Sequence, residues 1–156
     1  MHLFDKCAAF TIAREARAAG MYPYFQKITE SQDTEVVIDG HRKVMIGSNN
    51  YMGLTHHPKI LEAARVALEV YGSGNTGSRF LNGNLDIHDI LEEELADFTG
   101  KEAALVFSTG YQTNLGVVSA LVGRNDTAYL DKLDHACIQD GARLSFGETE
   151  RFRHED

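Results

Sequence analysis

The sequence predicts an α/β protein in which an N-terminal helix and a β-hairpin precede a mainly parallel sheet. Beyond residue 100, short apolar runs alternate with helical patterns, an order typical of parallel strands joined by right-handed helical crossovers. Earlier in the chain, two runs rich in β-branched residues, 35–38 and 42–46, flank the pair Asp39-Gly40. An Asp-Gly pair in this setting is a strong signal for a two-residue hairpin turn.

Three helical patterns precede the parallel sheet, and each has an identifiable stop. Glycine commonly follows the last residue of a helix, while proline or aspartate favours its first turn or its cap. The predicted helices run from Leu3 to Gly20, from Pro58 to Gly72, and from Asp86 to Gly100. A loop rich in Gly, Ser and Asn, residues 72–84, separates the second helix from the third.

The predicted parallel sheet has three strands in this chain. They are residues 103–107, 127–131 and 149–152, with helices near 115–122 and 138–144 between them. Parallel sheets are normally covered on both faces and contain more strands than this. We therefore expect the chain to be the front part of a larger protein.

The composition fits a soluble globular protein and argues against several other classes. Hydrophobic residues make up 43% and charged residues 24%, and the formal charge of −8 argues against a nucleic-acid surface. No apolar run is long enough to cross a bilayer, and the N-terminus has no signal-peptide core. Cys7 and Cys137 lack metal-ligand spacing, so we expect reduced thiols, a cytoplasmic protein and no metal site.

The most informative segment is the break between the first parallel strand and the next helix, at Ser108, Thr109 and Gly110. The free amides at a helix N-terminus, together with the helix dipole, favour binding of a phosphate. An ordinary strand-to-helix turn is the alternative. His135 lies just past the second strand, and residues beyond the carboxyl ends of neighbouring parallel strands line one crevice. The sequence therefore predicts an anion cradle and an imidazole that face the same ligand.

Two other motifs are weaker. Residues 72–77 match the dinucleotide fingerprint G-x-G-x-x-G, but a helix precedes them where the fingerprint requires a strand. A nucleotide-binding module built on this loop is therefore a minor alternative. His56 and His57 suggest a metal, yet no carboxylate or cysteine lies at ligand spacing, so a loop ahead of Pro58 is the better interpretation.

Taken together, several segments resemble the α-oxoamine synthases, fold-type I enzymes that use pyridoxal 5′-phosphate (PLP). The segments are residues 48–54 (SNNYMGL), 72–74 (GSG), 77–83 (GSRFLNG), 107–111 (FSTGY) with Asn114, and 134–136 (DHA). The resemblance covers nearly the whole chain. It implies that residues 1–47 form an N-terminal helix and hairpin segment. Residues 48–156 would be the first part of the PLP-binding large domain, whose remainder, like the C-terminal domain, lies outside this chain.

The family condenses an amino acid with an acyl-CoA and releases carbon dioxide. Residues 22–25 (YPYF), 32–36 (QDTEV), 77–83 and 123–126 (GRND) look most similar to the bacterial branch that acts on L-serine and palmitoyl-CoA. That branch makes 3-ketodihydrosphingosine, in the first step of sphingolipid synthesis. Residues 19–21 (AGM) stand where biotin-pathway relatives usually have arginines for a carboxylate-ended acyl chain, which favours an uncharged chain.

Two alternatives remain open. One is another α-oxoamine synthase, such as 8-amino-7-oxononanoate synthase or 2-amino-3-ketobutyrate CoA ligase. The other is a non-catalytic partner subunit that has lost its lysine. The presence of His135 and of the Gly110-Tyr111 cradle argues against such a scaffold, because a scaffold needs neither.

The resemblance implies roles for the cofactor site. The backbone around Thr109, Gly110 and Tyr111 would hold the PLP phosphate. His135, the expected catalytic residue, would stack on the pyridine ring and orient the substrate carboxylate.

The resemblance also implies substrate contacts. Asn50 and Tyr51 would lie near the substrate, while Ser78 and Arg79 would approach the site from the other subunit of a homodimer. For Arg79, a structural role within its own loop is the alternative. Any membrane contact would be peripheral.

The family's Schiff-base lysine has no counterpart in this chain. Lys101 follows a helix stop and Lys132 lies beside a strand end, so neither has the tuned pocket that a nucleophilic lysine needs. We therefore expect the lysine to lie outside residues 1–156, and the chain to be inactive alone.

Overall fold

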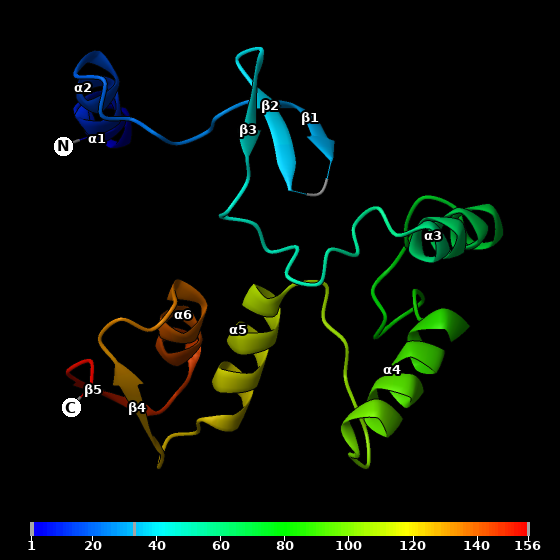
Figure 1. Cartoon of the computed structure of the whole chain (residues 1–156). Coiled ribbons are helices and arrows are strands. Elements are labelled where there is room, and N and C mark those ends of the chain that lie inside the picture. The colour runs from blue at the N-terminus through cyan, green and yellow to red at the C-terminus, as the bar shows by residue number, and fades with distance from the viewer. Residues whose placement is uncertain (1, 33, 156) are drawn as a thin grey trace. The chain divides into compact units, whose positions relative to one another are not determined.

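The computed structural model describes residues 2–32 and 34–155, and Figure 1 shows the order of the elements. Its internal contacts divide the chain into two compact units, residues 1–74 and 75–156. The predicted boundary after residue 47 stays a prediction. Residue 33, part of the 32–36 segment, lies outside the described residues. Within the described ranges, no helix is both long and apolar enough to cross a membrane.

The N-terminal region contains two short helices where the sequence predicted one. Helix α1 spans Leu3–Ala8 and α2 spans Ile12–Ala18. Ala9 is the C-cap of α1 and Thr11 is the N-cap of α2, so residues 9–11 separate the two helices. Gly20, with a φ of 69°, follows α2 in the left-handed region, as a helix-stop glycine should.

An antiparallel sheet follows, in which β1 (Ile28–Gln32), β2 (Glu35–Ile38) and β3 (His41–Val44) lie in that order. The hairpin between β2 and β3 confirms the prediction. Asp39 and Gly40 have φ values of 50° and 73°, both positive, as a type I′ turn requires. Strand β1 was not predicted, because its residues are mostly polar and carry no alternating apolar pattern.

Helix α3, Pro58–Tyr71, confirms the second predicted helix. Its cap is His57, whose Nδ1 accepts a hydrogen bond from the Lys59 amide at 3.3 Å. Pro58 occupies the first turn, where its missing N–H costs nothing. Gly72 has a φ of 79° and ends the helix. His57 is therefore a helix cap, in agreement with the prediction that the His56-His57 pair forms part of a loop before Pro58.

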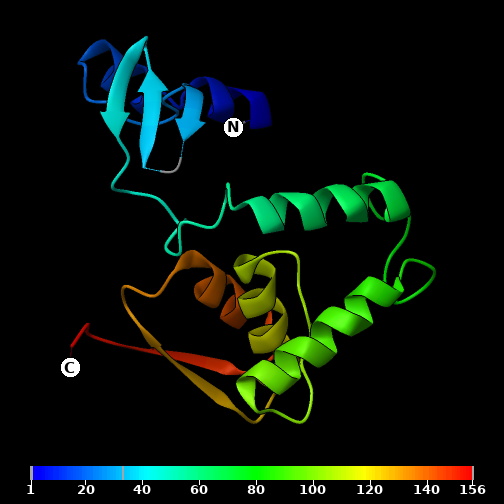
Figure 2. The same cartoon turned by 45° about the vertical axis from the view of Figure 1, so that its right-hand side comes forward.

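The second unit contains α4 (Asp86–Thr99), α5 (Gly110–Leu121), β4 (Thr127–Asp131), α6 (Ala136–Leu144) and β5 (Glu148–Phe152). Strands β4 and β5 pair in parallel, with Thr127 opposite Glu148. Helix α6 makes the crossover between them, so this part of the predicted parallel sheet is confirmed. Figures 1 and 2 both show α5 and α6 packed side by side.

The small core of this unit lies between β4, α5 and α6. Leu130 of β4 and Cys137 and Ala142 of α6 are at most 5% exposed. Gly141 lets α5 approach α6 closely, because a Cβ at this position would lie 2.9 Å from the Cβ of Val118. The close packing holds α6 against α5.

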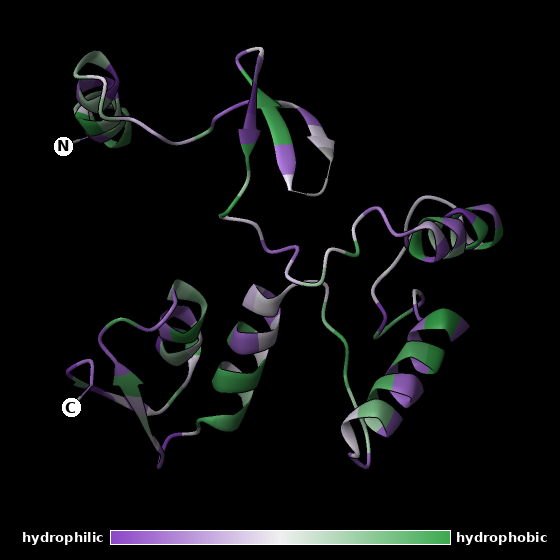
Figure 3. Cartoon of the chain, viewed as in Figure 1, coloured by the Kyte–Doolittle hydropathy of each residue, from purple (hydrophilic) through white to green (hydrophobic). Residues whose placement is uncertain are grey.

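Helix α4 begins one residue away from the predicted cap. Leu85 is the N-cap residue, Asp86 is the first residue of the helix, and the His88 ring accepts the Leu85 amide at 2.9 Å. Gly100 ends α4 with a left-handed φ of 65°, as predicted. Figure 3 shows apolar and polar residues alternating around α4, the pattern of a helix with one buried face.

The predicted strand at residues 103–107 is wrong as a paired strand. Among the described residues it has no partner strand, and only β4 and β5 form the parallel sheet. Side chains take the place of a neighbouring strand at Val106. Its amide donates to Glu92 Oε1 at 2.7 Å, and its carbonyl accepts from Arg79 Nη1 at 3.4 Å.

Candidate active site

The predicted break at residues 108–110 forms the N-terminus of α5, with Thr109 as its cap. Thr109 Oγ1 accepts a hydrogen bond from the Gln112 amide at 3.1 Å, and its carbonyl accepts from the Thr113 amide at 3.0 Å. The amides of Gly110 and Tyr111 have no acceptor within the described part of the chain. A Cβ placed on Gly110 would meet no atom within 4 Å, so this helix end is open. Two free donors at an open helix N-terminus suit an anion.

His135 is the N-cap of the neighbouring helix, α6. Its Nδ1 accepts the Cys137 amide at 3.2 Å and lies 2.9 Å from the Cys137 Sγ. A ring nitrogen that accepts a hydrogen bond carries no proton, so Nε2 carries the proton of the neutral imidazole. The cap therefore leaves Nε2–H as the donor that His135 can offer to a ligand.

Tyr111 joins the two helix ends. Its ring meets the His135 ring edge to face, with centroids 6.1 Å apart and planes at 76°. Its hydroxyl donates to the Asp140 carboxylate. This hydrogen bond is the main cause that raises the pKa of Tyr111, and it also lowers the pKa of Asp140. Tyr111 therefore stays a neutral phenol anchored to α6.

Asn114 and Cys137 complete the connection between the helices. Asn114 Nδ2 lies 3.0 Å from the Gly110 carbonyl oxygen and 3.3 Å from the Cys137 Sγ. The sequence analysis gave Cys137 no role. Its position two residues after His135 was the available signal, because the N-cap side chain accepts from the amide at that spacing. The structure thus brings Gly110, Tyr111 and His135 together at one end of α5 and α6.

Ser78 and Arg79 lie in the loop before α4, and their contacts are within this unit. The Ser78 carbonyl accepts the Leu81, Asn82 and Gly83 amides, which closes the loop. Arg79 binds Glu92 with its two terminal guanidinium nitrogens, Nη1 at 2.6 Å and Nη2 at 3.0 Å. These bonds support the structural alternative for Arg79, while the contact across subunits stays a prediction.

Asn50 and Tyr51 lie in the first unit. Asn50 Oδ1 accepts the Leu54 amide at 3.0 Å and the Thr55 amide at 3.3 Å, so this side chain shapes its own loop. Tyr51 is 85% exposed, and its hydroxyl contacts Asn49 Oδ1 at 3.2 Å. The placement of both residues near the substrate stays a prediction.

A cavity of about 660 Å³ lies beside the junction, that is, residues 106–111, which lead into α5. Ser108, Gln112 and Leu115 line it, and so do Arg79 and His88. Neither Tyr111 nor His135 lines it. The residues that line this cavity therefore do not include the imidazole of His135.

The chain is similar to known proteins over most of its length. Residues 41–156 match the aminotransferase class I and II family. The chain is 53% identical over 154 residues to serine palmitoyltransferase of Sphingobacterium spiritivorum, covering 99% of this chain and 39% of that protein. It is 46% identical over 153 residues to 8-amino-7-oxononanoate synthase of Methylococcus capsulatus, covering 98% of this chain and 39% of that protein.

A solved structure shares the fold over the full chain. It is a serine palmitoyltransferase variant from S. paucimobilis with a bound PLP–myriocin aldimine. Its TM-score is 0.92 and its sequence identity 38%, with 100% of this chain and 40% of that chain covered. The chain thus spans about two fifths of these relatives, in their N-terminal part. These matches confirm the predicted fold, the N-terminal portion of a fold-type I PLP enzyme. The chain belongs to the aminotransferase class I and II family.

Proposed function

We propose that this chain is the N-terminal part of a PLP-dependent acyltransferase that condenses L-serine with palmitoyl-CoA and releases carbon dioxide. The product would be 3-ketodihydrosphingosine. The observation that carries the proposal is the pair of free amides on Gly110 and Tyr111 beside the imidazole of His135. The identity of 53% with a serine palmitoyltransferase supports the choice of substrates.

The residues present fit PLP, which carries a phosphate and an aromatic ring. The open end of α5 offers two amide donors and the favourable end of a helix dipole to the phosphate. The imidazole of His135, held by Cys137 and Tyr111, offers a flat surface to the ring. When bound, PLP supplies an electron sink for the carbanion formed at the amino acid α-carbon.

The protein side of the reaction consists of binding and orientation. Gly110 and Tyr111 would hold the phosphate and so orient the cofactor. The Nε2–H of His135 would donate to the substrate carboxylate, because the Cys137 amide occupies Nδ1 and leaves the proton on Nε2. The carboxylate is thereby held in the geometry that carbon dioxide release requires.

The complete enzyme is proposed to be a cytoplasmic homodimer with the active site at the subunit interface. Any membrane contact would be peripheral, at the acyl chain. Both described cysteines are free thiols, in keeping with a reducing compartment. The guanidinium of Arg79 is bound to Glu92 of its own chain. We therefore propose that Ser78, more than Arg79, approaches the active site of the other subunit.

Release of free CoA by the complete enzyme tests the substrates. We expect release with L-serine and palmitoyl-CoA to exceed release with an acyl-CoA whose chain ends in a carboxylate. Glycine and L-threonine in place of L-serine serve as amino-acid controls. A preference for the carboxylate-ended chain would instead assign the protein to the 8-amino-7-oxononanoate synthases, which the 46% identity keeps as the second candidate.

A further inference from the structure

Arg79 and Glu92 form the most enclosed ion pair among the described residues, with side chains 29% and 16% exposed. The pair is bidentate, and Arg79 Nε also donates to Asn84 Oδ1 at 2.7 Å. Asp89 adds a longer contact to Arg79 at 3.8 Å. The hydrogen bond from Arg79 and a second one from the Val106 amide hold the pKa of Glu92 down at about 2. Glu92 is therefore ionised at every physiological pH.

The same pair forms hydrogen bonds with both backbone polar groups of Val106. Glu92 Oε1 accepts the Val106 amide at 2.7 Å, while Arg79 Nη1 donates to its carbonyl at 3.4 Å. An antiparallel neighbour would satisfy one residue of a strand in the same way, with one acceptor and one donor. At this edge the side-chain pair replaces a neighbouring strand and fixes the position of Val106.

Val106 lies directly before the residues that build the phosphate cradle. Phe107 packs against α5, where its ring lies 3.1 Å from the place that a Gly116 Cβ would occupy. Ser108 bonds Gln112, whose amide is capped by Thr109. Each residue from 106 to 109 is thus tied either to the ion pair or to α5. Movement of Val106 would be transmitted to the amides of Gly110 and Tyr111.

We propose that Arg79 and Glu92 are positioning residues that hold the 106–111 junction in the geometry needed to bind the cofactor phosphate. This inference rests on the proposed function and deepens it. It assigns Arg79 a role through the backbone of Val106 and not through contact with the substrate. The loop at residues 77–83 then serves as the support of the cradle.

The test compares PLP with pyridoxal, which lacks the phosphate, in the complete enzyme. The ratio of the affinity for PLP to the affinity for pyridoxal measures the contribution of the phosphate-binding amides of Gly110 and Tyr111. In Glu92→Ala we expect this ratio to fall on the order of tenfold, the effect of losing hydrogen bonds to a charged group. Affinity for pyridoxal should not change. Glu62→Ala is the matched control, because it removes the exposed Arg65–Glu62 pair on α3.

Two further variants separate positioning from simple ion pairing. Glu92→Gln retains an acceptor for the Val106 amide, so we expect its ratio to stay within about threefold of wild type. The charge swap Arg79→Glu with Glu92→Arg restores the ion pair, but its arginine cannot accept from the Val106 amide. We expect the swapped variant to have a low ratio of PLP affinity to pyridoxal affinity even if its melting temperature returns to the wild-type value.

The outcomes are distinct. A wild-type ratio in Glu92→Ala, or full recovery of the ratio in the swap, would overturn the positioning role. If Glu92→Ala does not fold, a low ratio in the folded Glu92→Gln variant would overturn it as well. A wild-type enzyme that binds PLP no better than pyridoxal would instead contradict the proposed cofactor site.

Discussion

Gly110 offers a substitution that removes one phosphate donor and spares the helix. It is the first residue of α5, where proline is well tolerated, and Thr109 before it is already extended at φ −146° and ψ 153°. We expect Gly110→Pro in the complete enzyme to weaken PLP binding on the order of tenfold. Absorbance titration with PLP measures the affinity, and thermal unfolding reports the fold.

Gly110→Ala is the matched control for this variant. It keeps the amide, and its Cβ meets no atom within 4 Å. We expect its PLP affinity to equal that of the wild type. Equal affinity in Gly110→Pro would show that this amide does not bind the phosphate.

Substitutions at His135 can separate its role as the helix cap of α6 from the role of its imidazole in turnover. The side chain caps α6 through Nδ1, and asparagine is an equally good cap that lacks the imidazole. We expect both His135→Asn and His135→Ala to keep PLP but to lose turnover on the order of a hundredfold, the effect of a misplaced reacting group. His135→Asn should also keep the wild-type melting temperature. Wild-type turnover in His135→Asn would leave His135 with a capping role alone.

The contacts of individual residues differ in how well the sequence predicts them. Free amides near Gly110 were predicted because the signal for a helix start at residues 108–110 lies within a few positions. The contact between Cys137 and His135 also spans only two positions, but its meaning depends on how α6 begins. The Arg79–Glu92 pair joins residues 13 positions apart across a loop, and no local pattern predicts such a contact.

At the scale of elements, the Arg79–Glu92 ion pair joins the 77–83 loop to α4 and makes the stability of the fold depend on pH. The pKa of Glu92 is lowered from 4.5 to about 2 on folding. A carboxyl group with a depressed pKa stabilises the fold above its unfolded pKa, and this stabilisation disappears as the pH falls through the folded value. The melting temperature of the wild type should therefore exceed that of Glu92→Gln above about pH 4.5.

Between about pH 4.5 and 2 the two melting temperatures should converge. Scanning calorimetry of the complete enzyme over this range measures the difference. A difference that grows as the pH falls would show that Glu92 is not stabilised as the carboxylate. The test is independent of PLP, so it examines the ion pair by itself.

Elements with strong local signals were predicted well, and those that depend on neighbours were not. The hairpin at Asp39-Gly40 and the helix from Pro58 follow from turn and cap chemistry that acts within a few residues. Strand β1 has a polar sequence and exists because β2 pairs with it. Residues 103–107 are apolar like a strand, yet a strand needs a partner, and Val106 is bound by side chains.

At the scale of the whole molecule, the proposed function gives this chain the amides that would bind the phosphate and the imidazole of His135. Many large apolar side chains are exposed, such as Phe98 at 87% and Leu105 at 70%. Exposed apolar surface of this kind marks interaction sites. The relatives are about two and a half times as long, since the chain covers 39% of the first of them. We propose, as the resemblance implies, that the lysine that carries PLP lies outside residues 1–156.

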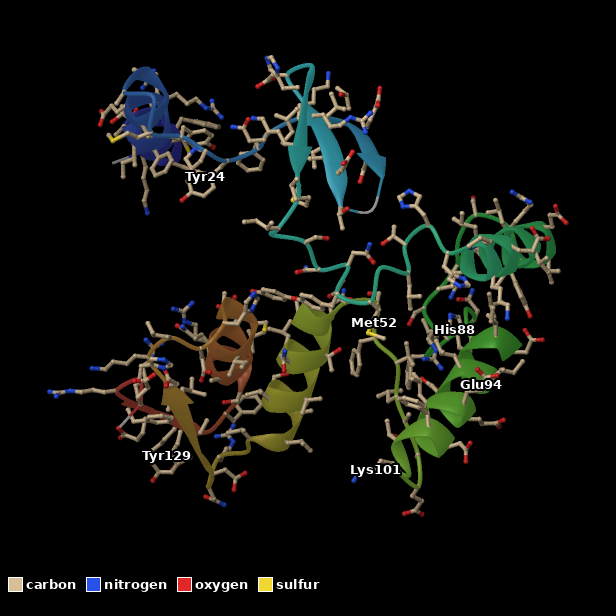
Figure 4. All side chains as sticks on the ribbon, in the orientation of Figure 1. Tyr24, Met52, His88, Glu94, Lys101 and Tyr129 are labelled. Atoms are coloured by element: carbon tan, nitrogen blue, oxygen red, sulfur yellow. The ribbon has the colours of Figure 1, made fainter. Side chains whose placement is uncertain are left out.

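Neither candidate lysine in this chain lies at the cradle in a suitable setting. Figure 4 shows Lys101 at the end of α4, at the opposite end of the segment that leads to α5. Lys132 follows β4, and its amide bonds the Phe152 carbonyl at 3.1 Å. Both side chains are exposed, and a nucleophilic lysine requires a pocket that tunes its pKa.

Peptide mapping after borohydride reduction of the PLP-loaded complete enzyme tests the central claim most directly. Borohydride fixes the cofactor to its lysine, and mass spectrometry of the digest identifies the modified peptide. We expect one stoichiometric adduct on a lysine outside residues 1–156 and none within them. A stoichiometric adduct on Lys101 or Lys132 would contradict the account and show that this chain contains the whole cofactor site.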